Sequence, residues 1–281
     1  MPLSAPDYQF LKNLVYKDSA IVLGDDHAYL LEARLGPLAQ LEGVADVTAL
    51  VRVLQKAADP ALRRRVVETM TTNETSFFRD IQPFEVLKNT ILPELIKKRA
   101  TERSLRIWSG AASTGQEACS LAMTLLEHQR DVALGWDVQI LGTDLSSRVV
   151  ERAKSGLYSQ LEVNRGLPAA MLMKHFTRSG VQWQTSSAVQ RLVQYRVMNL
   201  AAAWPLMPQF DIIFLRNVLI YFDMDTRRAI FTRLRNCLRK DGVLFIGGAE
   251  SIREADDAFE CVRAGSTHYY RHKTQPTTGI G

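Results

Sequence analysis

The chain has 281 residues, 46% of them hydrophobic and 23% charged, which is enough for one large domain or two smaller ones. This composition excludes a disordered acidic protein, a collagen and a disulfide-stapled miniprotein. The net charge of +5 raises the question of an acidic partner without naming its class. No uncharged stretch approaches the roughly 20 residues of a membrane span. No secretory signal opens the chain, and its cysteines, Cys119, Cys237 and Cys261, are widely spaced. We therefore expect a cytoplasmic protein with reduced thiols and no membrane insertion.

Residues 1–72 are expected to form an all-helical N-terminal domain, because their apolar side chains recur at helical spacing. The recurring positions are Phe10, Leu11, Leu14 and Val15, then Leu30, Leu31, Leu35 and Leu38, then Leu50, Val51 and Leu54. Asp59-Pro60 is typical of a helix N-cap and first helical position. One helix should therefore end before this pair and another begin at it.

A local excess of positive charge flanks that boundary. Residues 1–75 carry 8 Lys/Arg against 10 Asp/Glu, so the region as a whole is acidic. Five cations nevertheless follow closely along the chain with only Asp59 among them: Arg52, Lys56, Arg63, Arg64 and Arg65. Arg52 and Lys56 are four residues apart and share a helix face. The ordinary interpretation is a solvated face, and the alternative is a surface for an acidic partner.

From residue 105 short apolar runs alternate with amphipathic helices. The runs occupy 105–108, 138–141, 211–215 and 243–246, and helices are expected over 115–128, from 147, and over 225–238. This alternation predicts an α/β fold with a mostly parallel sheet covered on both faces. The tail, 274–281, is expected to fray.

Polar residues follow three of these strands, where open α/β sheets bind their ligands. The turn 109–117 is rich in small residues at a helix start, but it is neither a P-loop nor GxGxxG. Asp144 ends the next strand and suits the two hydroxyls of an adenosine ribose. Arg216-Asn217, with Tyr221 close behind, forms the third turn. Without a phosphate loop, the set favours a nucleoside-like cofactor such as S-adenosylmethionine, although each turn alone is equally compatible with simple helix caps.

Ordered blocks of sequence extend this interpretation along nearly the whole chain. They are Thr72–Arg79, Ser113–Glu117, Leu141–Ser146, Met198–Leu200, Phe210-Asp211, Arg216–Asp223 and Phe245–Ser251. Together they resemble the CheR-type chemotaxis receptor methyltransferases, whose TxNxTxFFR-like signature is similar to the first block. The resemblance implies a Rossmann-like methyltransferase domain over 73–281, with a small antiparallel β-subdomain inserted at 176–198 and the separate helical domain before it.

The resemblance also implies an activity. It implies a protein-glutamate O-methyltransferase that uses S-adenosylmethionine, releases S-adenosylhomocysteine and needs no metal. Its substrates would be glutamates in the cytoplasmic helical bundle of transmembrane chemoreceptors, esterified by a monomeric enzyme during chemotactic adaptation. Some members bind a receptor's C-terminal pentapeptide through the β-subdomain, but the compact turn at Ser179-Gly180 argues against such tethering here.

Carried over by position, the resemblance assigns the site residues. The cofactor-binding positions are Asn73, Thr75, Arg79, Glu117, Asp144, Asn199, Leu200, Arg216 and Asn217. The acceptor glutamate, with a pKa of about 4.3, is already ionised at neutral pH, so no general base is required. Arg79 and Tyr221 are the candidates that orient it, and the five cations at positions 52 to 65 would face the receptor. The family commonly has Gly-Glu-Glu-Pro-Tyr-Ser where this chain has Gly115–Ser120 with Gln116, Ala118 and Cys119, which keeps Glu117 but alters the packing.

Other function classes fit the sequence less well. Amino-group methylases of nucleic acids usually carry an (Asp/Asn/Ser)-Pro-Pro-(Tyr/Phe) turn after the fourth strand, and residues 216–219 are different. No basic stripe interleaved with aromatic residues indicates a nucleic-acid path either. A catalytically silent adapter that binds the cofactor or receptor, or a methyltransferase of another acidic substrate, stays open as an alternative.

Overall fold

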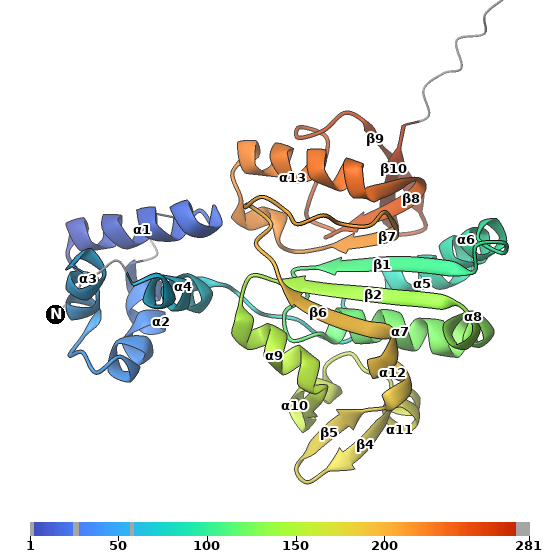
Figure 1. The fold of residues 1–281 in the computed structure, drawn as a ribbon, viewed down its shortest axis with the longest axis horizontal. Helices are drawn as coiled ribbons and strands as arrows, with labels where there is room; N and C mark the ends of the chain where they lie inside the picture. Colours follow the sequence, from blue (N-terminus) through green and yellow to red (C-terminus); the bar gives the residue numbers. More distant parts are fainter. Residues whose placement is uncertain (1–2, 25–27, 57–58, 274–281) are drawn as a thin grey trace, which may run out of the picture.

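The computed structural model describes residues 3–24, 28–56 and 59–273, so the expected frayed tail lies outside the described residues. Figure 1 shows two parts, an N-terminal cluster of helices and an α/β domain, joined by an extended linker over residues 71–81. The helical part lies beyond the carboxyl ends of strands β1 (Ser104–Gly110) and β7 (Phe210–Leu215), where the sheet is expected to bind ligands.

The predicted helical region consists of α1 (Ala5–Ser19), α2 (Ala28–Leu41), α3 (Val47–Lys56) and α4 (Pro60–Met70). Asp59 is the N-cap of α4 and its side chain accepts a hydrogen bond from the Ala61 N–H at 2.8 Å, as its sequence predicts. The apolar positions meet in one core, in which Leu11, Leu35 and Leu50 are completely buried. This core is separate from the two cores that flank the sheet.

The main sheet has seven strands in the order β6-β2-β1-β7-β8-β10-β9. Five strands, β6, β2, β1, β7 and β8, pair in parallel, and β10 runs antiparallel to both of its neighbours. The strands span β1 Ser104–Gly110, β2 Asp137–Asp144, β6 Val193–Val197, β7 Phe210–Leu215, β8 Leu238–Ile246, β9 Phe259–Ala264 and β10 Thr267–His272. The α/β fold with a mostly parallel sheet is confirmed.

Both faces of the sheet are covered, because successive strand residues point to opposite sides. Ile212 and Phe214 of β7 enter one core, and Ile213 and Leu215 enter the other. The first core is completed by helices α5 (Gln82–Val86), α6 (Leu92–Lys98), α7 (Gln116–His128), α8 (Arg130–Gly135) and α12 (Ser187–Leu192), together with a π-helical turn over Leu87–Ile91. The second is covered by α13 (Met224–Cys237), and α9 (Ser147–Ser155) flanks β2 and β6.

A small antiparallel sheet projects from the main body, with strand order β3-β5-β4. It is formed by β3 (Leu157–Ser159), β4 (Phe176–Ser179) and β5 (Gln182–Thr185), with helices α10 (Gln160–Asn164) and α11 (Ala169–His175) between β3 and β4. The two-residue turn after Ser179 is as compact as expected.

The placement of residues 193–198 in this subdomain is wrong. Val193–Val197 forms β6, which pairs in parallel with β2 at the edge of the main sheet, and the subdomain begins earlier, at Leu157. The alternation of Val193, Tyr195 and Val197 did indicate a strand. An alternating pattern reports that one face is buried, but it does not identify the strand that lies alongside.

Candidate active site

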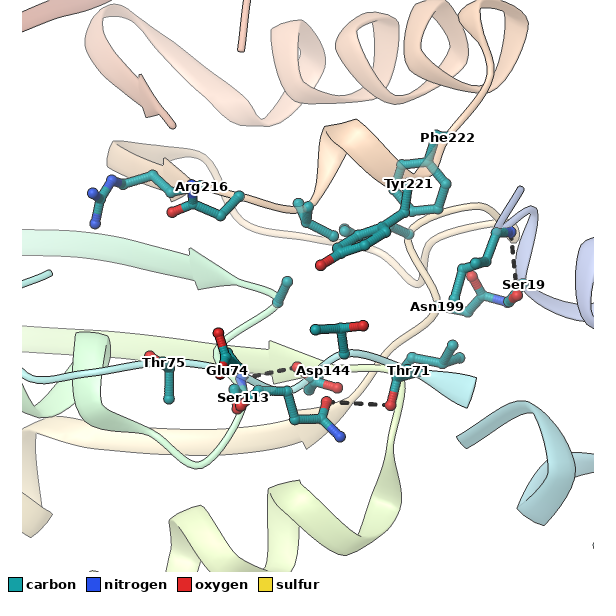
Figure 2. Close-up of a pocket in the computed structure, with 18 of the residues that line it drawn as sticks. Ser19, Thr71, Glu74, Thr75, Ser113, Asp144, Asn199, Arg216, Tyr221 and Phe222 are labelled. Carbon is teal, nitrogen blue, oxygen red and sulfur yellow. Dashed lines mark hydrogen bonds between the residues drawn. The ribbon is translucent and has the colours of Figure 1, made fainter. Parts of the chain in front are cut away.

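One cavity lies at the carboxyl ends of β1, β2 and β7 and contains about 910 Å³ of space free of protein atoms, open mouth included. Every residue assigned to the cofactor or to catalysis lines it: Asn73, Thr75, Arg79, Glu117, Asp144, Asn199, Leu200, Arg216, Asn217 and Tyr221. In Figure 2, Thr75, Ser113 and Asp144 form one side of this cavity and Arg216 and Tyr221 the other.

Asp144 ends β2 and is only 7% exposed. Its two carboxylate oxygens accept the backbone N–H groups of Ser113 at 2.9 Å and Ser146 at 3.0 Å. Burial raises the pKa of this carboxyl above its ordinary value, and the N–H groups oppose the shift. No ion pair with Asp144 forms within the described part of the chain, so its acceptor capacity is not used by a cation. A pair of neighbouring hydroxyls would donate hydrogen bonds to the remaining lone pairs of this carboxylate.

The linker after α4 closes one side of the cavity. The Ser113 hydroxyl donates to the Asn73 carbonyl at 2.7 Å, which ties the linker to the loop after β1. The Asn73 side chain in turn accepts the Thr71 hydroxyl at 3.2 Å. Asn73, which lines the cavity, is therefore held at both its backbone and its side chain.

Two tyrosines hold the loop after β1 through hydrogen bonds to its backbone carbonyls. The Tyr158 hydroxyl donates to the Thr114 carbonyl at 3.0 Å and the Tyr195 hydroxyl to the Gly115 carbonyl at 3.2 Å. The Cys119 sulfur lies 3.5 and 3.6 Å from these hydroxyls, so the small thiol leaves room for both rings. Gly115 has φ +93°, and a Cβ there would lie 2.6 Å from the Tyr195 hydroxyl.

Glu117 and Arg216 form a buried ion pair at the inner end of the cavity. The Arg216 guanidinium, 1% exposed, lies 3.0 Å from Glu117 and 2.6 Å from Asp80. It also donates to the Arg79 carbonyl at 3.0 Å, while the Ser109 hydroxyl donates to the other Glu117 oxygen at 2.7 Å. The Arg216 Nε is buried without a hydrogen-bond partner among the described residues, which leaves one donor for a ligand. No sequence pattern indicated that Asp80 pairs with Arg216.

Arg79 belongs to a backbone segment with unusual dihedral angles. Phe78, Asp80 and Ile81 have φ values of 48°, 65° and 44°, a left-handed conformation that costs energy for side chains larger than glycine. Phe77 and Phe78 are buried, as expected for residues that seat the linker, and they anchor this segment. The Arg79 guanidinium donates to the Glu74 carbonyl at 3.1 Å and lines the cavity.

Tyr221 follows β7 through a turn and a short 3₁₀ helix, Leu219–Tyr221. Figure 2 shows its ring reaching into the cavity. Its carbonyl accepts the Val22 N–H at 2.9 Å, and Phe222 forms an antiparallel bridge with Ile21. The chain after α1 therefore reaches the cavity, where Ser19 and Ile21 are lining residues that the sequence interpretation missed. Helical periodicity carries no signal for this contact across some 200 residues.

Asn199 and Leu200 follow β6 at the end of the cavity next to Asp144. The Asn199 side chain donates to the Asp18 carbonyl at 2.8 Å and accepts the Ala201 N–H at 2.9 Å. The Leu200 carbonyl is occupied by Trp204 and Arg233 at 3.0 and 2.7 Å. The Leu200 N–H and side chain are therefore the groups that this residue can offer to a ligand.

The five cations do not form one continuous positive face. Arg63 lies 3.0 Å from Asp18, and Arg65 lies 2.7 Å from Glu42. Arg64 has Glu68 at 4.0 Å but stays 66% exposed. Arg52 and Lys56 are exposed and have no ion-pair partner within the described ranges. Acidic residues that are distant in the sequence thus neutralise part of the run, and Arg52, Lys56 and Arg64 carry most of its exposed charge.

Comparison with known proteins identifies the family of this chain. Residues 73–268 match "CheR methyltransferase, SAM binding domain", and residues 6–71 match "CheR methyltransferase, all-alpha domain". The chain belongs to the CheR methyltransferase family. It is 38% identical over 276 residues to "Chemotaxis protein methyltransferase 1" of Pseudomonas aeruginosa, covering 97% of this chain and 100% of the relative. It is 37% identical to "Chemotaxis protein methyltransferase" of Vibrio parahaemolyticus, covering 96% and 98%.

The cavity suits the cofactor that the family name specifies. S-adenosylmethionine presents a diol, an ammonium, a carboxylate and an adenine edge, and no phosphate. Asp144 offers a buried anionic acceptor, and Arg216 a spare buried donor. Among the described residues no cluster of three or more His, Cys, Asp or Glu is placed to hold a metal ion. No helix in the described part of the chain is long and apolar enough to cross a membrane.

Proposed function

We propose that this chain transfers a methyl group from S-adenosylmethionine to glutamate side chains in the cytoplasmic helices of chemoreceptors. The product is a γ-glutamyl methyl ester, and the enzyme acts as a monomer in the cytoplasm. The observation that carries the proposal is the convergence on one cavity of ten residues from the linker, the ends of four strands (β1, β2, β6 and β7) and the Tyr221 turn, in a chain of the CheR family. The helical domain, residues 1–72, is proposed to recognise the receptor and 73–281 to perform the transfer.

Binding of the cofactor is proposed to use the groups already described. Asp144 accepts from the ribose hydroxyls, and Asn199 with the Leu200 backbone contacts the adenine edge. Glu117 attracts the ammonium, although it shares its charge with Arg216 at 3.0 Å. Arg216 also pairs with Asp80 at 2.6 Å, so two carboxylates share one guanidinium and the cluster keeps a net negative charge that attracts the ammonium. Asn73 and Thr75 contact the cofactor from the linker.

The chemistry requires alignment rather than proton transfer. When bound, S-adenosylmethionine supplies a methyl group on a positively charged sulfur, which leaves as the neutral thioether of S-adenosylhomocysteine. The acceptor carboxylate is ionised at neutral pH and is itself the nucleophile. This chain's residues must strip its water and hold one oxygen in line with the methyl carbon. The Arg79 guanidinium and the Tyr221 hydroxyl are proposed to do so by binding the acceptor carboxylate.

The exposed part of the basic run is proposed to contact the acidic receptor bundle. The double variant Arg52→Glu/Lys56→Glu should lower receptor methylation about tenfold at low salt, with binding of S-adenosylhomocysteine unchanged. Lys97→Glu/Arg130→Glu is the matched control, because it changes the net charge equally on α6 and α8, at the opposite end of the sheet. The defect should shrink in added salt as screening weakens the attraction. If Arg52→Glu/Lys56→Glu methylates the receptor at the wild-type rate at low salt, the proposal that these residues contact the receptor is refuted.

One experiment separates the proposed activity from its alternatives. The protein is incubated with methyl-labelled S-adenosylmethionine and receptor-containing membranes, and the label is then exposed to alkali. Carboxyl methyl esters hydrolyse, whereas N-methyl groups do not. Alkali-labile label on the receptor supports the proposal. Tight cofactor binding without any transferred label would instead identify a silent adapter, and label on another acidic protein would identify a different substrate.

A further inference from the structure

A buried carboxylate behind the cavity has no part in the proposed chemistry. Glu250 follows β8 and is only 7% exposed. One of its oxygens accepts the N–H groups of Gly247 at 2.6 Å and Asn217 at 2.9 Å, and the other accepts the Leu219 N–H at 2.7 Å. No ion pair with Glu250 forms within the described part of the chain. Burying a carboxylate without a cation is costly, so three backbone donors on one side chain indicate a specific task.

Two of the three N–H groups that Glu250 holds, those of Asn217 and Leu219, belong to the turn that carries Tyr221. Asn217 has φ +57°, a conformation that needs outside support in a residue other than glycine. Leu219 begins the 3₁₀ helix that ends at Tyr221. By binding the N–H groups on both sides of Val218, the carboxylate fixes the turn at its entry and at its exit.

The surroundings of Glu250 leave the carboxylate little freedom. A Cβ on Gly247 would lie 2.7 Å from the Glu250 oxygen, and 2.9 and 3.0 Å from side-chain and backbone nitrogens of Asn217. Glycine is therefore needed at 247 for Glu250 and the turn to approach this closely. Arg216, at the start of the same turn, is fixed separately by Glu117 and Asp80. Loss of Glu250 would thus loosen the Tyr221 end of the turn while the Arg216 end keeps its own contacts.

We propose that Glu250 is a positioning residue that sets the Tyr221 hydroxyl for methyl transfer by holding the N–H groups of Asn217 and Leu219. The proposal rests on the proposed function of the cavity and on the role of Tyr221 in it. Glu250 touches neither substrate nor cofactor in this scheme. It acts through the backbone of the turn.

The test compares Glu250→Gln with the wild type. An amide keeps the shape but offers one acceptor oxygen, so at least one of the three N–H groups loses its partner and meets an NH₂ group. In the cofactor-free protein, amide hydrogen exchange across 217–221 should become about tenfold faster. Turnover of labelled methyl groups should fall about tenfold, and the Kd for S-adenosylhomocysteine should change less than about threefold.

A double-mutant cycle shows whether the effect passes through Tyr221. In a Tyr221→Phe background, Glu250→Gln should lower turnover by less than about twofold, because the group it positions is already gone. Gly247→Ala should reproduce the exchange and turnover changes by displacing the carboxylate, which keeps the test decisive if Glu250→Gln does not fold. Asp211→Asn is the control at a second buried carboxylate, which accepts a backbone N–H, that of Arg106 at 2.8 Å, and is in addition ion-paired with Arg99 at 2.7 Å. It should leave exchange at 217–221 and turnover unchanged below its melting temperature.

The outcomes distinguish the positioning role from the proposed function. Unchanged exchange at 217–221 in folded Glu250→Gln would overturn the role, and so would a turnover loss that multiplies fully with that of Tyr221→Phe. The exchange measurement needs no substrate. The wild type could exchange slowly at 217–221, and Glu250→Gln faster, while the wild type methylates no receptor. That result would refute the proposed function and leave the hold of Glu250 on the turn established.

Discussion

The cavity has two walls that are built in different ways. On the sheet wall, Asp144 and Arg216 are buried and the Glu117 side chain is 12% exposed, and each is held by at least two hydrogen bonds. On the helical wall, the segment that carries Ser19 and Ile21 meets the α/β domain through the Val22–Tyr221 hydrogen bond, the Ile21–Phe222 bridge and the bond from the Asn199 side chain to the Asp18 carbonyl. The fold of one domain sets the sheet wall, whereas the helical wall exists only when two domains are docked. We therefore expect the sheet wall to determine cofactor affinity and the helical wall to adjust it.

The largest expected effect follows from removing the sheet wall's anion. Asp144→Asn should weaken binding of S-adenosylhomocysteine about 100-fold, because two charge-assisted hydrogen bonds to the ribose are lost or weakened. Titration calorimetry measures the change. Asp137→Asn, at the exposed start of the same strand, is the control and should bind normally. A loss below about threefold would contradict the assignment of the ribose to Asp144.

The raised pKa of Asp144 provides a second test of the part that the sheet wall plays in cofactor binding. Because burial raises this pKa, the carboxyl takes up a proton at a higher pH than an ordinary aspartate at about 3.9. Cofactor affinity should therefore decline as the pH falls toward the raised pKa, and Asp144→Asn should lose this dependence. The free energy of unfolding responds with the opposite sign. The contribution of Asp144 is greatest below the unfolded-state pKa and is lost as the pH rises through the folded-state pKa. Calorimetry and thermal melts across mildly acidic pH test both trends.

Tyr221 lies where the two walls meet, and its effect should be on rate. Tyr221→Phe should lower turnover about tenfold, the value of one orienting hydrogen bond, and change cofactor affinity by less than about twofold. The ring and its packing stay, so the fold should not suffer. Turnover of labelled methyl groups, measured beside calorimetric affinity, gives both values. An unchanged turnover would remove Tyr221 from the mechanism.

The smallest effect is expected from the helical wall. The Tyr16 hydroxyl donates to Asp223, the N-cap of α13, and this bond lowers the pKa of Asp223 and raises that of Tyr16. Tyr16→Phe removes one domain-to-domain bond and should weaken cofactor binding only about two- to threefold. Tyr29→Phe is the control, because Tyr29 is 70% exposed on α2. A loss as large as that of Asp144→Asn would break the distinction between the walls.

The sheet wall was largely predictable from the sequence. Short apolar runs located β1, β2, β7 and β8, and parallel strands bring their carboxyl ends to one edge. Polar residues directly after those strands, such as Asp144 and Arg216, therefore had to lie near one another. The blocks shared with the CheR family added the linker residues, including Asn73. Chain order and periodicity are sufficient here because each position follows from the strand that precedes it.

The remaining features depend on contacts that local patterns do not record. Burial periodicity shows that Leu11 faces a core, but not that the chain after α1 meets Tyr221. The ion pairs of Arg63 and Arg65 join residues tens of positions apart, so charge counted along the chain overstated the positive face. Strand β6 was assigned to the wrong sheet for the same reason.

The bridge between Ile21 and Phe222 has a consequence for how the protein is made. One side of the cavity emerges from the ribosome near the start of synthesis, and the other only when some four-fifths of the chain has been translated. A nascent or truncated chain that ends before residue 222 can fold its helices but cannot complete the cavity. Ligand that binds only the completed cavity stabilises the finished protein by mass action, so protection from proteolysis by S-adenosylhomocysteine should extend to α1 as well as to the sheet.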